Sequence, residues 1–384
     1  MKNKLTLLLL LSFVSSCSSL SSLNFWSNDS EEDTTTPAEL QSFQEDFVVS
    51  IVWKQSFKAS NDLGSFKPSF YAGEMLVADS DGEITSLNPK TGKLNWTKSL
   101  DRTLSAGIAS GFGKFVVSDG DGNVIGFDLD SKEILWETNV GGEVLANVVI
   151  DASLVVVKNS VGELIALDSL IGEKKWTFRS QLPALTVRGT GEPIIKDGMV
   201  FSTFDNGRLA AFQLNTGFFL WDGPISFLEG SSELENLIDA DSSPVFEKQL
   251  IFATNYQGNL TAFDMAQKRP VWNSQASSFH SPVIGKGMIM VIQDDGSILS
   301  FSSANLASSW VSDEYTRRDL SNGVMLNNLL LVGDLEGYVH VIDPLAGNTI
   351  GRKKVSGKPI KSISTFGGLA YILDQDSNLV AISL

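Results

Sequence analysis

The chain has 384 residues, of which 42% are hydrophobic, and a formal net charge of −16 at pH 7. A surface this acidic repels nucleic acid and anionic lipid headgroups, so nucleic acid is not expected as a partner. One cysteine and two histidines are too few for a zinc or thiol centre, and a single cysteine forms no internal disulfide.

Residues 1–16 have the pattern of a secretory signal peptide. Two lysines precede an apolar run, Leu5 to Leu11, that is too short to span a bilayer. Cys17 comes directly after Val14-Ser15-Ser16, which resembles the lipobox of bacterial lipoproteins. The resemblance implies cleavage before Cys17 and lipidation of this residue, and Ser18 implies sorting to the outer membrane, facing the periplasm. The alternative is an ordinary signal peptide in which the cysteine is incidental.

Residues 17–47 are expected to form an acidic, disordered tether that begins at the lipidated cysteine. No lysine or arginine occurs between Ser18 and Ser50. The acidic residues of this segment are Asp29, Glu31, Glu32, Asp33, Glu39, Glu45 and Asp46. Low hydrophobicity and charge of one sign keep such a segment solvated rather than folded. The folded domain is therefore expected to span residues 48–384.

The rest of the chain consists of one unit that is repeated. Each copy carries a glycine in the same short phrase, at Gly82, Gly122, Gly162, Gly207, Gly258, Gly296 and Gly337. The steps between these glycines are 40, 40, 45, 51, 38 and 41 residues. In the first six copies a tryptophan follows fourteen residues later, at Trp96, Trp136, Trp176, Trp221, Trp272 and Trp310. This spacing indicates a repeat architecture.

Each unit contains four short strands. In the first unit, residues 75–78 are apolar, Ser80-Asp81-Gly82 is a tight turn, and residues 83–87 alternate with period two. A second turn, residues 88–92, leads into the tryptophan strand. In later units an apolar stretch before the first hairpin adds one more strand, which makes four strands in each unit. Four-stranded sheets that repeat about every forty residues are typical of β-propeller blades, with a solenoid as the main alternative.

The two ends of the chain are expected to share an eighth blade. Residues 376–382 align with the first hairpin of a unit, but no tryptophan strand follows them. Residues 49–53 are a tryptophan strand with no turn before it. The prediction is therefore an all-β, eight-bladed β-propeller of four-stranded antiparallel blades, with its ring closed by the N-terminal strand.

The repeated tryptophans are interpreted as plates between neighbouring blades, because burial of an aromatic ring removes a large apolar area from water. A ligand-stacking role is the less favoured alternative. The seventh unit has Ile350-Gly351 where the others have tryptophan. Its contact with the next blade is therefore expected to be weaker.

The chain shows no pattern that requires catalysis. His280 and His340 have no HxxxH spacing, and His340 lies in an alternating stretch typical of a strand. Residues 119–123 look like part of a calcium loop but lack the later bidentate glutamate and match the turn of the other blades. Counting does not exclude a Ser-His-Asp triad, but no nucleophile elbow is present. No cofactor or metal is therefore predicted.

The phrase Leu-Asn-Pro-Lys-Thr-Gly-Lys-Leu-Asn-Trp at residues 87–96 resembles the blade motif of quinoprotein alcohol dehydrogenases. Those enzymes carry vicinal cysteines against the quinone and a calcium ion at the ring centre, and this chain matches neither feature. It is more similar to the non-catalytic, lipid-anchored propellers of the BamB family, from the signal peptide to Leu384. Residues 182–189 and 230–244 make that resemblance specific.

These two segments lie where the repeat spacing swells to 45 and 51 residues, so they are insertions that a bare propeller does not need. Long loops on a rigid scaffold concentrate binding residues. The candidate partner-binding residues are Leu185, Val187, Arg188, Asp239 and Asp241. Apolar side chains beside an arginine are enriched at interface centres.

The two aspartates follow an expected short helix over residues 233–237 and could orient Arg188 or meet a basic partner. In the BamB family the matching loops dock on the periplasmic POTRA domains of BamA, and the five candidates match the interface positions. Read without the family, Leu185 and Val187 are strand core and Asp239 is a turn cap.

The resemblance implies a non-catalytic scaffold lipoprotein of the outer membrane β-barrel assembly (BAM) complex. Its expected partners are the BamA POTRA domains, the outer membrane through the lipid anchor, and unfolded outer membrane protein precursors. The alternatives are a quinone-dependent dehydrogenase and a periplasmic propeller that binds a carbohydrate or peptide.

Overall fold

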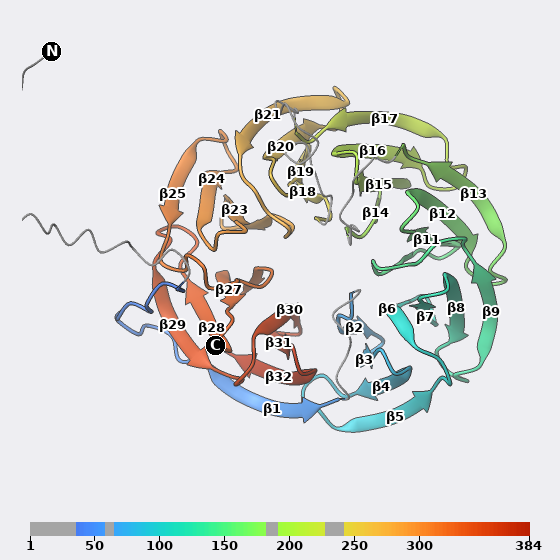
Figure 1. Cartoon of the computed structure of the whole chain (residues 1–384), viewed down its shortest axis with the longest axis horizontal. Coiled ribbons are helices and arrows are strands. Elements are labelled where there is room, and N and C mark those ends of the chain that lie inside the picture. The colour runs from blue at the N-terminus through green and yellow to red at the C-terminus, as the bar shows by residue number, and fades with distance from the viewer. Residues whose placement is uncertain (1–35, 58–64, 182–190, 227–241) are drawn as a thin grey trace, which may run out of the picture. The chain divides into compact units, whose positions relative to one another are not determined.

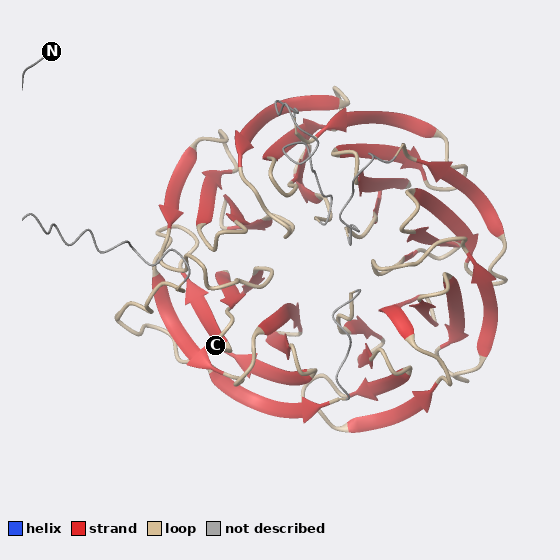
Figure 2. Ribbon diagram, viewed as in Figure 1, coloured by secondary structure: helices blue, strands red, loops and turns tan. Residues whose placement is uncertain are grey.

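A computed structural model describes residues 36–57, 65–181, 191–226 and 242–384 (Figures 1 and 2). Every regular element in these ranges is a β-strand, and the strands form eight four-stranded antiparallel sheets. The sheets are arranged as blades around a central opening (Figure 1). The expected eight-bladed propeller is confirmed.

The strands of the first four blades follow the chain from the centre outward. Blade one is β2 (Ser69–Tyr71), β3 (Glu74–Ala78), β4 (Glu83–Leu87) and β5 (Leu94–Ser99). Blade two is β6 (Leu104–Gly111), β7 (Lys114–Asp119), β8 (Asn123–Asp128) and β9 (Ile134–Asn139). Blade three is β10 (Val149–Ile150), β11 (Leu154–Lys158), β12 (Glu163–Asp168) and β13 (Lys174–Arg179). Blade four is β14 (Ile194–Lys196), β15 (Met199–Phe204), β16 (Arg208–Gln213) and β17 (Phe219–Pro224).

The remaining blades repeat this order, except that the last one takes its outer strand from the N-terminal end. Blade five is β18 (Val245–Glu247), β19 (Leu250–Ala253), β20 (Asn259–Asp264) and β21 (Arg269–Gln275). Blade six is β22 (Val283–Gly285), β23 (Met288–Ile292), β24 (Ile298–Ser302) and β25 (Ser308–Ser312). Blade seven is β26 (Val324–Leu326), β27 (Leu329–Gly333), β28 (Tyr338–Ile342) and β29 (Thr349–Lys354). Blade eight is β30 (Ile360–Phe366), β31 (Leu369–Asp374), β32 (Asn378–Ser383) and β1 (Ser50–Ser56).

Strand β1 closes the ring. It pairs antiparallel with β32, with Ser50 opposite Ser383 and Ser56 opposite Asn378. Figure 1 shows β1, in blue, beside β32, in red. The prediction that the two ends of the chain share the eighth blade is confirmed.

Six of the seven repeated turn glycines have a positive φ, and at the remaining turn Gln257, directly before Gly258, has it instead. Gly122, between β7 and β8, has φ of +82°, and a Cβ built there would lie 2.5 Å from the Gly142 carbonyl oxygen. The Asp119 carboxylate caps this turn by accepting the amide of Asn123 at 2.8 Å. The Asp119–Asn123 phrase is thus explained as a hairpin cap. Equivalent caps are made by Asp79, Asn159, Asn255, Asp334 and Asp374.

Four of the tryptophans dock on the second turn of the following blade. Trp176 of blade three donates its indole N–H to the Leu214 carbonyl at 2.7 Å and lies against Gly217 in blade four. The same contact joins Trp53 to Gly92, Trp136 to Gly172 and Trp310 to Gly347. The glycines are needed because a side chain would occupy the space of the indole ring. The interpretation of these residues as plates between blades is confirmed.

The core lies between the blades. Eight buried apolar clusters are found in the described residues, and each one joins two neighbouring blades. The cluster between blades seven and eight is the largest of them, although blade seven has Gly351 in place of tryptophan. The apolar contact at blade seven is therefore not reduced, contrary to expectation.

Residues 37–47 differ from the expected tether. They belong to the same compact unit as the propeller, Pro37–Leu384. The amides of Asp46 and Phe47 donate to the Ile350 carbonyl at 2.8 and 3.0 Å, and Ala38 N–H donates to the Thr316 carbonyl at 3.0 Å. Residues 37–47 thus lie in the compact unit of the ring, which composition does not indicate because it does not reveal backbone contacts with a distant blade.

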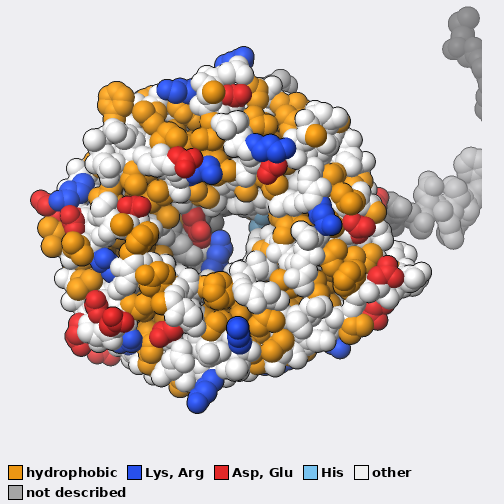
Figure 3. All heavy atoms as spheres, turned by 180° about the vertical axis from the view of Figure 1, so that it is seen from behind, with side chains coloured by type: hydrophobic (Ala, Val, Ile, Leu, Met, Phe, Trp, Pro, Cys, Tyr) orange, Lys and Arg blue, Asp and Glu red, His pale blue; other side chains and the backbone are white. Residues whose placement is uncertain are grey.

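The opening runs through the ring, as the space-filling view from behind shows (Figure 3). Hydrophobic side chains on that face form patches between separated charged ones. Within the described ranges, no helix has the length and apolar character needed to cross a membrane.

Candidate partner-binding face

The topology places the described residues on either side of both insertions on one face of the ring. In a four-stranded antiparallel blade, the connection that leaves the outermost strand emerges on the same side as the middle hairpin. We call this side the connector face, because it carries the links from each blade to the next. Residues 182–190 lie between β13 and β14, and residues 227–241 lie between β17 and β18. The described residues that flank both insertions therefore lie on this face.

The predicted site residues themselves lie outside the described ranges. Leu185, Val187 and Arg188 fall within residues 182–190, and Asp239 and Asp241 fall within residues 227–241, as does the expected helix over 233–237. Cys17 precedes the first described residue. The structure describes the residues on which the two insertions begin and end.

The two insertions return to the ring side by side. The amide of Glu192, two residues after the first insertion, donates to the Ser243 hydroxyl at 3.0 Å. Ser243 follows the second insertion by two residues, and its own amide donates to the Ser281 hydroxyl at 2.9 Å. This series of hydrogen bonds fixes the relative position of the points at which the described chain resumes after each insertion.

Glu192 is the centre of a polar cluster at the base of the first insertion. Its carboxylate accepts hydrogen bonds from the Lys67 ammonium at 3.0 Å and the Asn147 amide at 3.2 Å. Lys67 belongs to the connection before blade one, and Asn147 to the connection before blade three. Half-exposed ion pairs add little stability, so positional order is the main effect of this cluster.

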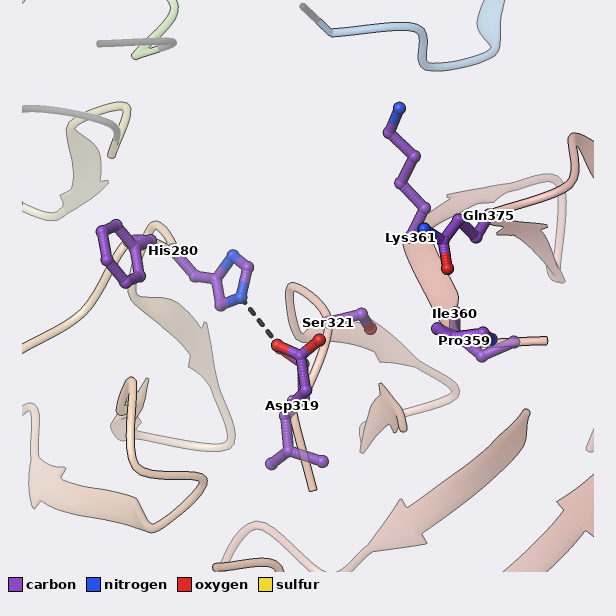
Figure 4. A pocket seen from close by; sticks show the side chains of 9 residues that line it. His280, Asp319, Ser321, Pro359, Ile360, Lys361 and Gln375 are labelled. Carbon is purple, nitrogen blue, oxygen red and sulfur yellow. Dashed lines mark hydrogen bonds between the residues drawn. The ribbon is translucent and has the colours of Figure 1, made fainter. Parts of the chain in front are cut away.

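A pocket of about 320 Å³ opens on the connector face beside blades six, seven and eight (Figure 4). Its lining residues are Phe279, His280, Asp319, Leu320, Ser321, Pro359, Ile360, Lys361 and Gln375. The His280 ring donates through Nε2 to the Leu320 carbonyl at 2.9 Å. Phe279 stacks on Tyr256 of blade five with ring centroids 4.4 Å apart, and 38% of Phe279 is exposed. The pocket offers an apolar wall with a few polar groups, as binding surfaces do.

The other histidine is structural. His340 lies on β28, as predicted, and is fully buried. Its Nε2–H donates to the Asp334 carboxylate at 3.0 Å, and its Nδ1 accepts from the Arg352 guanidinium at 3.0 Å. Burial lowers the pKa of His340 below its ordinary value, although Asp334 acts in the opposite direction. The imidazole is therefore neutral at pH 7, with both nitrogens occupied.

The Glu192 cluster and the pocket both lie on the connector face. The described ranges contain no group of three His, Cys, Asp or Glu side chains placed to hold a metal ion. Sequence reasoning located the two insertions but missed the Glu192 cluster and the pocket. Their residues come from connections far apart in the chain, and none of them carries a local motif.

These features define a class, the propellers built from the quinoprotein-type repeat, here with enlarged connections on one face. Residues 80–312 match the family model described as outer membrane protein assembly factor BamB. The Pseudomonas aeruginosa protein of that name is 38% identical over 351 residues, covering 91% of this chain and 92% of the relative. That from Kangiella koreensis is 36% identical and covers 84% of each chain. The chain belongs to the BamB family of outer membrane protein assembly factors.

Solved structures agree on the fold. The crystal structure of BamB from Moraxella catarrhalis superposes with a TM-score of 0.80 at 22% identity, covering 88% of this chain and all of that one. A europium-containing methanol dehydrogenase reaches a TM-score of 0.71 at 12% identity, covering 88% of this chain and 93% of the enzyme. The propeller fold is thus shared between assembly factors and dehydrogenases, and the fold by itself does not separate the two functions.

Proposed function

We propose that this chain is a non-catalytic scaffold lipoprotein of the BAM complex that binds the POTRA domains of BamA through its connector face. One observation carries the proposal beyond family membership. The ring does not need the two enlarged connections, yet hydrogen bonds from Glu192 to Ser243 and from Ser243 to Ser281 hold together the residues that directly follow them. Loops held close together on a rigid ring can present one continuous surface to a partner.

The expected contact residues give that surface a recognisable chemistry. Leu185 and Val187 supply apolar area and Arg188 supplies a cation that pairs well with carboxylates. Asp239 and Asp241, on the second insertion, either orient Arg188 or meet basic groups of the partner. Unfolded outer membrane protein precursors are the second class of partner in the proposal.

Membrane attachment is assigned to Cys17. The acidic chain, with a sequence pI of about 4.6, gains nothing from anionic headgroups, so acyl chains must supply the attachment. This assignment places the propeller in the periplasm at the inner surface of the outer membrane.

The quinone-dependent dehydrogenase is not favoured as an alternative. Its support is a shared fold at 12% identity. The vicinal cysteine pair of those enzymes cannot be formed by a chain with a single cysteine, which stands next to the expected cleavage site.

Co-purification tests the proposal. The full-length chain with a C-terminal tag is solubilised from membranes in mild detergent, and its partners are identified by mass spectrometry. Another tagged outer membrane lipoprotein serves as the control. We expect BamA to be enriched with this chain and not with the control. Recovery without BamA, or with bound quinone, would contradict the proposal.

A further inference from the structure

Blade seven breaks the repeat at one position. Gly351 of β29 stands fourteen residues after Gly337, where the six preceding units have tryptophan. A tryptophan there would have no turn to dock on. The other docking tryptophans lie against the turn between the third and fourth strands of the next blade, but the fourth strand of blade eight is β1, so no turn joins it to β32.

The N-terminal segment occupies this position. The Ile350 carbonyl accepts the amides of both Asp46 and Phe47, and a Cβ built on Gly351 would lie 2.6 Å from the Phe47 carbonyl oxygen. A side chain at residue 351 is therefore incompatible with the observed path of the segment. Three residues past Asp46, Val49 is 3% exposed and belongs to the apolar cluster between blades seven and eight.

Two arginines hold the beginning of the same segment. Arg318 donates to the Ala38 carbonyl at 2.8 Å, and Arg352 donates to the Gln41 carbonyl at 3.0 Å. The Arg352 guanidinium also lies 4.8 Å from the centroid of the Phe43 ring, which is a cation–π distance. The segment is thus bound through its backbone at both ends and through an aromatic side chain in between.

Both arginines are fixed in place from within the ring. The Arg318 side chain is 4% exposed and donates to Asp334 at 2.9 Å, and the Arg352 side chain is 11% exposed and pairs with Glu314 at 2.9 Å. His340 bridges the two halves of this network, since it contacts both Asp334 and Arg352. Buried arginine donors that lose an acceptor cost free energy, so Ala38 and Gln41 complete the network.

We propose that residues 37–49, here called the strap, replace the missing tryptophan of blade seven and lock that blade to blade eight. The socket formed by Arg318, Arg352 and Gly351 is the binding site for the strap. Because the strap is bound along blade seven, the chain leaves the ring there, and only residues 18–36 remain as tether to the lipidated cysteine. The inference is independent of any contact with BamA.

The first test couples the strap to Gly351. The mature chain is compared with versions that lack residues 37–47 or residues 18–36, each with and without Gly351→Ala. Residue 351 has no positive φ, so alanine is tolerated by the backbone itself. We expect Gly351→Ala to lower the Tm by several degrees when the strap is present and to have little effect when residues 37–47 are absent. Deleting residues 18–36 should leave the Tm unchanged.

The second test measures occupancy of the socket. Glu39 and Glu45 are the glutamates of the strap, so a glutamate-specific protease reports its release. Loss of a cation–π contact should make Phe43→Ala about two to five times more susceptible to cleavage at these sites. Gln44→Ala, at the neighbouring exposed position, is the matched control and should behave like the parent chain.

An equal effect of Gly351→Ala with and without residues 37–47 would overturn the proposal. The same conclusion follows if Phe43→Ala and Gln44→Ala are cleaved at the same rate as the parent chain.

Discussion

At the scale of single residues, the contact between a tryptophan and a turn glycine is the recurring unit of this ring. The indole ring lies where a Cβ would project, and its N–H donates to a carbonyl of the same turn, as in the pair Trp176 and Gly217. Each repeat with this contact therefore supplies an indole ring that fits the turn of the next blade, in addition to the apolar residues of its own strands.

Substitution of Gly217 separates backbone strain from overpacking. Gly217 has φ of +67° and its Cβ would lie 2.5 Å from the Trp176 ring, whereas Gly198 has φ of +72° with nothing within 4 Å. Both alanine variants incur the left-handed backbone cost of roughly 1–2 kcal/mol. Gly217→Ala should lose a further 1–3 kcal/mol or so from overpacking. Urea unfolding of the two variants measures the difference, and equal losses would argue against the docking contact.

His340 makes stability depend on pH. Burial lowers its pKa in the folded chain below the unfolded value of about 6.5. The groups that face it are Asp334, Arg352, Arg318, Tyr315 and Tyr338. The pKa of Asp334 is also lowered; burial alone would raise it, but hydrogen bonds from the His340 ring, the Tyr338 amide and Arg318 outweigh that effect.

The direction follows from proton linkage. Between the unfolded and folded pKa of His340, the unfolded chain binds a proton that the folded chain does not, so stability falls as pH drops below about 6.5. Asp334 loses its contribution only at more acidic pH. We expect His340→Gln to be less stable at pH 7.5 but to show a shallower decline between pH 6.5 and pH 5 than the parent chain. Urea unfolding of both proteins between pH 7.5 and pH 5 tests this prediction. The same decline of stability with pH in the variant and the parent chain would contradict it.

At the scale of elements, the role of β1 could be predicted by comparing the first and last segments of the sequence. A tryptophan strand without a turn and a final hairpin without a tryptophan strand predicted their pairing. The pairing with β32 is observed, and Trp53 of β1 donates to the Pro89 carbonyl of blade one at 2.9 Å. Strand β1 thus connects blade eight to blade one.

Trp53→Ala tests this closure. Truncation of a large buried aromatic costs about 3–5 kcal/mol, and the loss here should be toward the lower end because Trp53 is only partly buried. Val52→Ala, on the same strand but 44% exposed, is the control and should change stability by less than about 0.5 kcal/mol. Similar melting temperatures for the two variants would show that β1 does not close the ring.

The strap shows why the rest of the fold could not be predicted. Its composition, with three acidic residues and no lysine or arginine, favours disorder, and nothing within residues 37–47 indicates a partner. Its partners, Arg318 and Arg352, follow it by roughly 300 residues, at separations of 280 and 311 from Ala38 and Gln41. The one local signal was the missing tryptophan at Gly351, which was interpreted as a weaker contact rather than as space for another segment.

The candidate site also has one part that the sequence predicted and one part that it did not. Swelling of the repeat spacing located both insertions, because a regular repeat makes any extra residues visible. The Glu192 cluster could not be predicted from the repeat spacing. Lys67 and Asn147 contact Glu192 only because the connections of separate blades lie together on one face of the folded ring.

At the scale of the whole molecule, the proposed function gives the ring a membrane anchor at Cys17 and a partner at the connector face. The anchor is tested by Cys17→Ala, which removes the only thiol of the chain. We expect unprocessed precursor or soluble periplasmic protein in cell fractionation, with a Tm like that of the parent, because the ring begins 20 residues later at Pro37. Normal recovery in the outer membrane fraction would sink the lipoprotein assignment.

The most direct test of the central claim is the affinity of the chain for purified BamA POTRA domains. Leu185→Ala combined with Arg188→Ala removes an expected anchor and its apolar surround. At about 2 kcal/mol or more for each, the pair should weaken binding roughly a thousandfold if the effects add. Leu170→Ala combined with Lys174→Ala, at the exposed turn on the opposite face, is the matched control. The account predicts lost affinity with an unchanged melting curve for the first variant and full affinity for the control. Unchanged affinity in a folded Leu185→Ala, Arg188→Ala variant would contradict it.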